Sequence, residues 1–191
     1  MAGVIESRVS DGQPPAGTPR FSLVIPAHNE EALLPRLLDS VDRARVRYAG
    51  GRESIEVIVV DDGSADATGR IARARGCRTI AAGARRIARA RNAGARAARG
   101  AILAFVDADS QIHPDTFNEI DRLLSDERVI GGTSGAVFER QSTGLRCTFA
   151  GIALAGLAFR GIRALRHRGM DTGAVFCARA DFEALGGYRE N

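Results

Sequence analysis

The stretch Ile102–Gln111, with the sequence ILAFVDADSQ, joins five apolar residues to two aspartates that are one residue apart. Isoleucine, phenylalanine and valine in such a run predict a buried strand of a parallel sheet that is covered on both faces. Side chains two positions apart in a strand share a face, so Asp107 and Asp109 project the same way if the extended geometry continues. Two neighbouring carboxylates repel each other unless a positive charge lies between them. The stretch therefore predicts a strand that ends in an anionic site.

A hard divalent cation is the natural partner of this Asp-x-Asp pair, because Mg2+ takes oxygen ligands and shares them with substrate phosphates. Ala108 between the two aspartates is small, which lets a ligand approach the backbone. The alternative is a strand that ends in a solvated turn. An isolated Asp-x-Asp does not decide between the two, so the rest of the chain has to.

The remaining chain alternates short apolar runs with segments whose apolar residues are spaced for one helix face. The expected helices are 30–47, 66–75 with Asp66 as N-cap, 85–99 and 114–126. The expected strands are 21–25, which stops at Pro26, then 55–60, 77–81, 101–106, 129–132 and 135–139. This alternation predicts an α/β fold, in which a Rossmann-like, mostly parallel sheet is flanked by helices.

Three polar clusters follow strands that we expect to be parallel. They are PAHNE (26–30), DDGS (61–64) and DADSQ (107–111). Right-handed crossovers bring the carboxyl ends of parallel strands to one edge of the sheet, and ligands bind outside that edge. The coincidence of the three clusters indicates one binding site more strongly than any single motif does.

Each cluster allows a ligand-binding and a structural interpretation. An aspartate at the end of the second strand can accept hydrogen bonds from a base or a ribose, or it can form an Asx turn that caps the next helix. We expect one of Asp61 and Asp62 to do each. Glu30 can line a nucleotide pocket, or it can compensate the dipole of the following helix.

Composition limits the class of protein. From the 191 residues we expect one globular domain, 20–191, behind a disordered leader, 1–19, with no signal peptide and no membrane-spanning run. All 27 basic residues are arginine, and the three cysteines fit a reducing cytoplasm better than a disulfide framework.

Six arginines lie in 85–99 without interleaved aromatic residues, so we expect a solvated helix face and no nucleic-acid binding. A phosphate contact from Arg89 or Arg91 is the alternative.

Four segments together resemble the family 2 glycosyltransferases, which have the GT-A fold. In chain order they are SLVIPAHNEE (22–31), IEVIVVDDGSADATGRIA (55–72), ARARNAGARAARGAILAFVDADSQIHPDTF (88–117) and DTGAVFCARADFEALGGYRE (171–190). The resemblance runs from Phe21 to the last residue. It implies a hexosyltransferase that uses a UDP- or GDP-sugar donor, a divalent metal (Mg2+ or Mn2+) and an inverting single displacement.

By position, the resemblance also implies the site residues. Gln111 matches a position that helps to hold the metal in polyprenyl-phosphate sugar transferases such as dolichyl-phosphate mannose synthase. The implied metal ligands are Asp107, Asp109 and Gln111, with Asp109 the more direct one. The implied residues around the nucleotide sugar are Pro26, Ala27, His28, Glu30, Val60, Asp61, Asp62, Gly63, Ser64, Asn92, Asp107, Ala108 and Asp109.

The general base is the open part of this interpretation. Inverting members use a carboxylate in a Glu-Asp pair a few residues beyond the Gly-Gly-aromatic turn, and the sequence ends at Asn191 without such a pair. Asp171 is a candidate for the role, with a turn-capping carboxylate as the alternative. We therefore expect an incomplete domain that binds the donor but transfers sugar poorly.

The acceptor is not evident from the sequence. Apolar residues 147–159, followed by a basic run, fit either an amphipathic helix on the inner face of a membrane, which suits a lipid-linked acceptor, or a core helix. Two other functions stay open. One is a nucleotide-sugar-binding fragment without catalysis, and the other is a nucleotidyltransferase, which is disfavoured because no Gly-rich phosphate loop follows the first strand.

Overall fold

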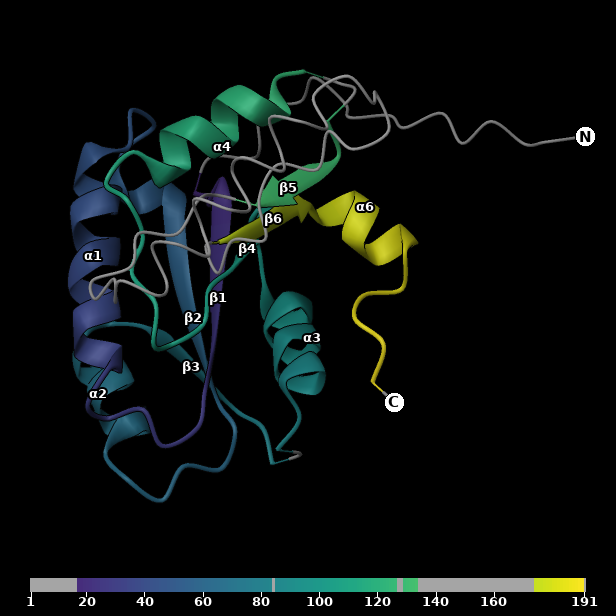
Figure 1. Cartoon of the computed structure of the whole chain (residues 1–191). Coiled ribbons are helices and arrows are strands. Elements are labelled where there is room, and N and C mark those ends of the chain that lie inside the picture. Colours follow the sequence, from purple (N-terminus) through teal and green to yellow (C-terminus); the bar gives the residue numbers. More distant parts are fainter. Residues whose placement is uncertain (1–16, 84, 127–128, 134–173, 191) are drawn as a thin grey trace, which may run out of the picture.

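The computed structural model describes residues 17–83, 85–126, 129–133 and 174–190. They form a six-stranded sheet in the order β3-β2-β1-β4-β6-β5 with helices packed on it (Figure 1). The strands are β1 (Phe21–Ala27), β2 (Ile55–Asp61), β3 (Arg78–Ala81), β4 (Ile102–Phe105), β5 (Gly131–Thr133) and β6 (Val175–Ala178). The helices are α1 (Leu34–Arg47), η1 (Arg52–Ser54), α2 (Thr68–Ala74), α3 (Ile87–Ala97), α4 (Thr116–Leu124) and α6 (Arg179–Ala184).

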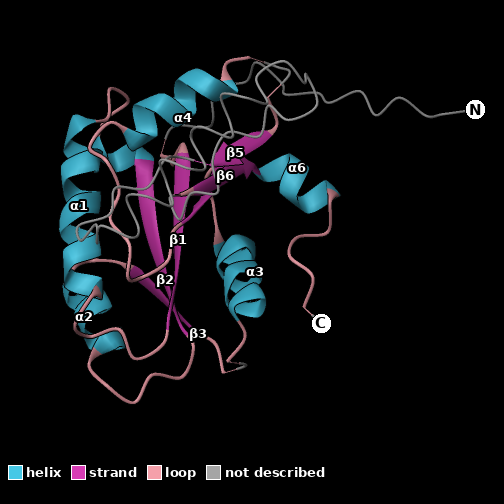
Figure 2. Ribbon diagram, viewed as in Figure 1, coloured by secondary structure: helices cyan, strands magenta, loops and turns pink. Residues whose placement is uncertain are grey.

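The expected α/β architecture is confirmed. Strands β3, β2, β1 and β4 pair in parallel, and β6 pairs antiparallel with both β4 and β5. All seven residues of β1 are buried. The side chains of Phe21, Leu23 and Ile25 pack towards α1 and α4, whereas Val24 packs towards α3. Figure 2 shows α1, α2 and α4 on one side of the sheet and α3 on the other.

Strand β1 does not stop at Pro26, as the sequence analysis expects, but continues to Ala27. Backbone groups of successive residues in a parallel strand alternate between the two neighbours. The Ala27 carbonyl accepts a hydrogen bond from Asp62 N–H of the β2 side, so the position of Pro26 faces β4. The last hydrogen bond between β1 and β4 runs from Val106 N–H to the Val24 carbonyl. Pro26 cannot donate the next one, so the pairing with β4 stops here while the pairing with β2 continues to Ala27.

Several helices begin later than the sequence analysis expects. Residues 30–33 form a turn in which the Glu30 carbonyl accepts hydrogen bonds from the N–H groups of Leu33 and Leu34, so α1 starts at Leu34. Asp66 is not the N-cap of α2. It lies two residues before Thr68, and its Oδ1 accepts hydrogen bonds from both the backbone N–H (2.9 Å) and the hydroxyl (2.5 Å) of Thr68.

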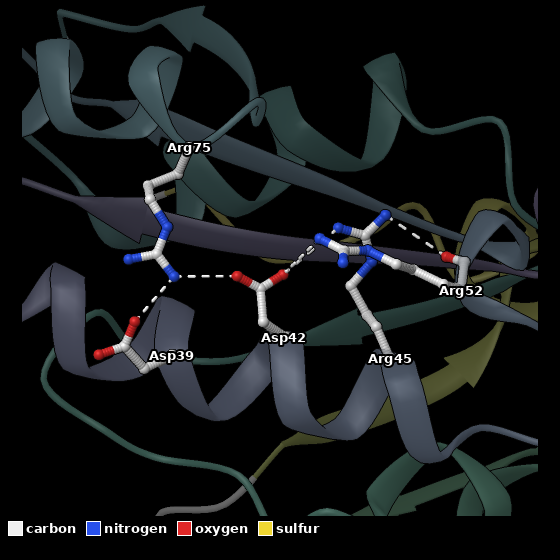
Figure 3. A network of polar contacts seen from close by, with 5 residues as sticks. All are labelled: Asp39, Asp42, Arg45, Arg52 and Arg75. Carbon is white, nitrogen blue, oxygen red and sulfur yellow. Dashed lines mark hydrogen bonds and ion pairs between the residues drawn. The ribbon is translucent and has the colours of Figure 1, made fainter.

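Ion pairs join α1 to its neighbours on the surface (Figure 3). Arg75, at the end of α2, contacts Asp39 at 2.8 Å and Asp42 at 2.9 Å. Asp42 also contacts Arg52 of η1 at 3.0 Å and Arg45 at 3.8 Å. Exposed pairs of this kind each contribute at most about 1 kcal/mol, so the network orients α1 while the buried core holds it in place.

Some expectations concern residues outside the described ranges. These are most of the leader, the strand at 135–139, the apolar segment 147–159 and Asp171. In the part of the chain that the structure describes, no helix is both long enough and apolar enough to cross a bilayer.

Close packing of α3 on the sheet depends on Gly94. A Cβ atom at this position would lie 2.3 Å from Val24 Cγ1 and 3.0 Å from Val60 Cγ2. The contact with Val24 is shorter than side chains in a protein core tolerate and the contact with Val60 is tight, so glycine is the residue that suits the close approach of α3 to the sheet. Because α3 also carries residues of the cavity described below, this spacing helps to position the functional site.

We expect Gly94→Ala to lower the free energy of unfolding by about 1–3 kcal/mol, the usual cost of overpacking a core. The better helix propensity of alanine offsets only part of this loss. Urea denaturation measures the change. Gly83→Ala is the matched control, because a Cβ at Gly83 meets no heavy atom within 4 Å. Equal stabilities of the two variants would contradict the packing argument.

Candidate functional site

An open cavity of about 360 Å³ lies at the carboxyl ends of β1, β2 and β4. The edge is therefore the one at which the sequence analysis places a binding site. The cavity is lined by Pro26, Ala27, His28, Glu30, Asp62, Arg85, Ile87, Ala90, Asp107, Ala108 and Asp109. The structure thus brings residues from all three predicted polar clusters to one cavity.

The two aspartates after β2 have different roles in the structure. Asp61 Oδ1 accepts a hydrogen bond from Ser64 N–H at 2.9 Å, which closes the turn that leads to α2. Asp62 is buried and lines the cavity, and its Oδ1 accepts a hydrogen bond from Arg85 N–H at 3.1 Å. One carboxylate therefore serves the turn, and the other is fixed in the cavity wall.

Side-chain and backbone hydrogen bonds join the loop after β1 to the loop after β2. Asn29 contributes two, because its N–H donates to Ser64 Oγ (3.0 Å) and its Oδ1 accepts from Ala65 N–H (2.8 Å). Glu30 N–H donates to Thr68 Oγ1 at 2.7 Å. Further bonds join Glu31 N–H to Asp66 Oδ2 at 3.1 Å and Ala67 N–H to Glu31 Oε2 at 3.0 Å. The two loops form one rigid wall of the cavity.

His28 is oriented by the same network. Its Nδ1 lies 3.0 Å from the Asp62 carbonyl oxygen, which can only accept, so this nitrogen carries the proton. Its Nε2 then accepts from Asn29 Nδ2 at 3.3 Å. These two hydrogen bonds fix the orientation of the imidazole, which lines the cavity.

The Asp-x-Asp motif lies in a turn and not in an extended segment. Strand β4 ends at Phe105, and the Asp107 carbonyl accepts a hydrogen bond from Ser110 N–H at 3.0 Å. The extended geometry considered for the two aspartates is therefore not present, although both line the cavity. Asp107 accepts a 2.6 Å hydrogen bond from Arg91 Nη2, whereas Asp109 is exposed.

Glu30 is held in an unfavourable electrostatic environment. Partial burial and the charges of Asp109 and Asp66 together raise the pKa of the Glu30 carboxyl above its ordinary value of 4.5. Like charges that converge on an open cavity are typical of a cation site. The cavity therefore favours a positively charged ligand near Glu30 and Asp109.

The chemistry of these donors fits a divalent metal that is completed by its substrate. Among the described residues, no three His, Cys, Asp or Glu side chains are grouped so that they could hold a metal ion alone. Asp109 and Asp107 do line the same cavity. Mg2+ and similar hard cations are commonly held by one or two carboxylates together with phosphate oxygens and water.

Other predicted site residues lie away from the cavity. Val60 is buried in the core, and Gly63 and Ser64 belong to the turn before α2. Gln111 is half-buried and is not among the residues that line the cavity. Asn92 is buried against the C-terminal segment, where it binds Tyr188 and Glu190, so its predicted place beside the nucleotide is not what the structure shows.

Three lining residues are absent from the predicted set: Arg85, Ile87 and Ala90. Arg85 adopts a positive φ of 45°, which directs its N–H to Asp62. Ile87 is 54% exposed, and it adds apolar surface to the cavity lining. In the sequence, the isoleucine near the start of the predicted helix is the one available signal, because neither Ala90 nor the backbone conformation of Arg85 leaves one.

We expect Glu30→Gln to stabilise the ligand-free chain at neutral pH. A carboxyl with a raised folded-state pKa costs stability once it ionises, and this cost is absent below its ordinary pKa of 4.5, where both folded and unfolded chains are protonated. Thermal unfolding should therefore show a higher Tm for the variant at pH 7 and a difference that shrinks as the pH falls towards 4.5. Glu53→Gln, an exposed residue of η1, is the control. A Tm at pH 7 that is lower for Glu30→Gln than for the wild-type chain would refute the conclusion that the ionised Glu30 carboxylate destabilises the fold.

Solved structures share the fold. The mannosyltransferase PcManGT from Pyrobaculum calidifontis, in complex with GDP-Man and Mn2+, superposes with a TM-score of 0.67 at 22% identity, over 92% of this chain and 49% of that one. Glucosyl-3-phosphoglycerate synthase from Mycobacterium tuberculosis, in complex with Mn2+, UDP and glucosyl-3-phosphoglycerate, gives a TM-score of 0.58 at 28% identity, over 85% of this chain and 57% of that one. The GT-A type fold is thereby confirmed.

Sequence comparisons agree with the fold. The undecaprenyl-phosphate 4-deoxy-4-formamido-L-arabinose transferase of Pseudomonas paraeruginosa is 37% identical over 115 residues, which are 54% of this chain and 31% of the relative. The chain thus spans about a third of the length of that curated relative. The family model described as glycosyl transferase family 2 matches residues 22–178. The chain therefore belongs to glycosyl transferase family 2, whose motifs its sequence resembles.

Proposed function

We propose that the chain binds a UDP- or GDP-sugar together with Mg2+ or Mn2+ and forms the donor-binding part of an inverting glycosyltransferase. The observation that carries this proposal is the cavity at the carboxyl edge of the sheet. It has a buried aspartate, Asp62, on one wall and the acidic pair Asp107 and Asp109 on another. A nucleoside diphosphate needs both kinds of group, one for its base or ribose and one for the cation on its phosphates.

The nucleoside lies against Asp62 in this proposal. The hydrogen bond from Arg85 N–H fixes the carboxylate, so that it can accept from a base or ribose donor without reorganising. Ile87 and Ala90 give the cavity an apolar surface on which a base can pack. His28 and Pro26 complete the lining near the wall formed by the two loops.

The diphosphate lies against the acidic pair. Asp109, with Asp107 beside it, would hold the divalent cation, and the exposed position of Asp109 makes it the more direct ligand. A bound cation supplies charge neutralisation for the departing nucleoside diphosphate. The two similar solved structures described above contain Mn2+, one with GDP-Man and the other with UDP, so they support the metal while leaving both nucleotides open.

The proposals for the general base and for the class of acceptor are supported by the chemistry of the reaction and by one relative. In an inverting single displacement, an acceptor oxygen attacks the face of the anomeric carbon opposite to the leaving nucleoside diphosphate. A carboxylate takes the proton where this oxygen belongs to a hydroxyl, whereas an ionised phosphate oxygen carries no proton to remove. Asp171 stays a proposal for this base, because it lies outside the described residues. The undecaprenyl-phosphate transferase among the relatives supports a lipid-linked acceptor at a membrane surface as the acceptor class to test first.

We expect Asp109→Asn to abolish the metal dependence of nucleotide binding. The affinity for UDP and GDP is measured by calorimetric titration with and without Mn2+. With Mn2+ present, the variant should bind at least about tenfold more weakly than the wild-type chain, because a charged ligand of the cation is lost. Asp107→Asn should lose less, since Asp107 is already paired with Arg91. Unchanged, metal-dependent affinity in Asp109→Asn would rule out the metal assignment.

The neighbouring aspartates provide a second, internally controlled test. Asp62→Ala should weaken binding of the nucleoside diphosphate even without metal, because the lost group faces the base or ribose. Asp61→Ala should keep the affinity and lose about 1 kcal/mol of stability, since it removes only the hydrogen bond to Ser64 N–H. The Kd for the nucleoside diphosphate and the free energy of unfolding are measured for both variants. Weaker binding in Asp61→Ala together with unchanged binding in Asp62→Ala would exchange the roles of the two aspartates.

A further inference from the structure

The C-terminal residues 186–190 pack on α3, outside the cavity. Asn92 binds this segment through three hydrogen bonds, because its Nδ2 donates to the Tyr188 carbonyl (2.9 Å) and to Glu190 Oε1 (2.8 Å), and its Oδ1 accepts from Tyr188 N–H (2.9 Å). A Cβ at Gly187, where φ is +74°, would lie 2.8 Å from Asn92 Oδ1. The Gly-Gly-Tyr sequence is therefore suited to this close contact with the helix.

The same segment makes further contacts with α3 and the sheet. Glu190 lies 3.4 Å from Arg89 and 3.9 Å from Arg96, both on α3. The Tyr188 ring packs edge-on against Phe105 of β4, with ring centroids 5.3 Å apart. Tyr188 is thus fixed from two sides, and no residue of the segment lines the cavity.

Arg91 connects this segment to the cavity. Its guanidinium carbon lies 5.3 Å from the centroid of the Tyr188 ring, and its Nη2 donates to Asp107 Oδ1 at 2.6 Å. Its Nε is buried and has no hydrogen-bond acceptor among the described residues. The aromatic face and the carboxylate are therefore the two contacts through which the described structure orients the guanidinium.

We propose that Arg91 is a positioning residue that orients Asp107 in the donor cavity and offsets its charge, and that residues 186–190 control donor affinity by holding Arg91. The inference rests on the proposed function, because it assigns a role in binding the nucleoside diphosphate. The cavity wall carries four carboxylates, Glu30, Asp62, Asp107 and Asp109. An unpaired Asp107 would repel the phosphates and would be free to leave its position beside Asp109.

A double-mutant cycle tests this role. With Mn2+ and whichever of UDP and GDP the wild-type chain binds, Arg91→Gln should weaken binding about tenfold, and Tyr188→Leu should weaken it severalfold. Tyr188→Phe retains the aromatic face and should recover the affinity. In an Asp107→Asn background, Arg91→Gln and Tyr188→Leu should each change Kd less than about twofold, because the group on which they act is gone.

Two results would overturn the inference. One is an equal loss of affinity from Arg91→Gln with and without the Asp107 carboxylate, and the other is wild-type affinity in Arg91→Gln. If Tyr188→Leu does not fold, as thermal unfolding will show, the cycle between Arg91 and Asp107 decides alone. Leu185→Ala, an exposed residue next to the segment, controls for surface changes there. A wild-type chain that binds neither nucleotide with Mn2+ would instead overturn the proposed function itself.

Discussion

The parallel pairing of β1 with both β2 and β4 is the constraint on which the rest of the structure depends. Every residue of β1 is buried, so neither face of the strand can carry a solvated group. The polar side chains that line the cavity therefore lie at or beyond the last ladder pairs, Ala27 with Asp61 and Val24 with Phe105. Because the three strands run in the same direction, these positions meet at one edge, and the cavity forms there.

Carboxyl groups at the two ends of the sheet have pKa values shifted in opposite directions. At the amino end, burial alone would raise the pKa of Glu56, but hydrogen bonds from Ser22 and Arg99 lower it below its ordinary value. At the carboxyl end, Glu30 has a raised pKa and faces the negative charge of Asp109. A fully hydrogen-bonded carboxylate stabilises the fold, whereas a destabilised one is typical of a site that awaits a ligand.

The fold could be predicted from the sequence wherever one local signal sufficed. Consecutive apolar residues identify the buried strands, and the polar residues that follow them identify the edge, including Asp62, Asp107 and Asp109. Contacts between distant segments left no such signal. Asn92 binds Tyr188 and Glu190, almost a hundred positions along the chain, and this partnership accounts for its burial on α3.

Local rules also failed where tertiary context reversed them. Proline usually ends a strand, but Pro26 ends only the pairing of β1 with β4, and β1 continues in its pairing with β2. An arginine with positive φ is uncommon, so the backbone of Arg85 could not be foreseen as the partner of Asp62. The antiparallel insertion of β6 between β4 and β5 likewise depends on where the chain returns to the sheet, which periodicity does not encode.

The hydrogen bonds that join the loops after β1 and β2 have a thermodynamic consequence for ligand capture. Asn29, Glu30 and Glu31 are already bonded across to Ser64, Ala65, Asp66, Ala67 and Thr68 in the ligand-free chain. The conformational entropy of ordering this wall is therefore lost during folding and not when the nucleotide arrives. On that side of the cavity the binding surface is preformed. The nucleotide should therefore bind without a rearrangement of the two loops that would slow association.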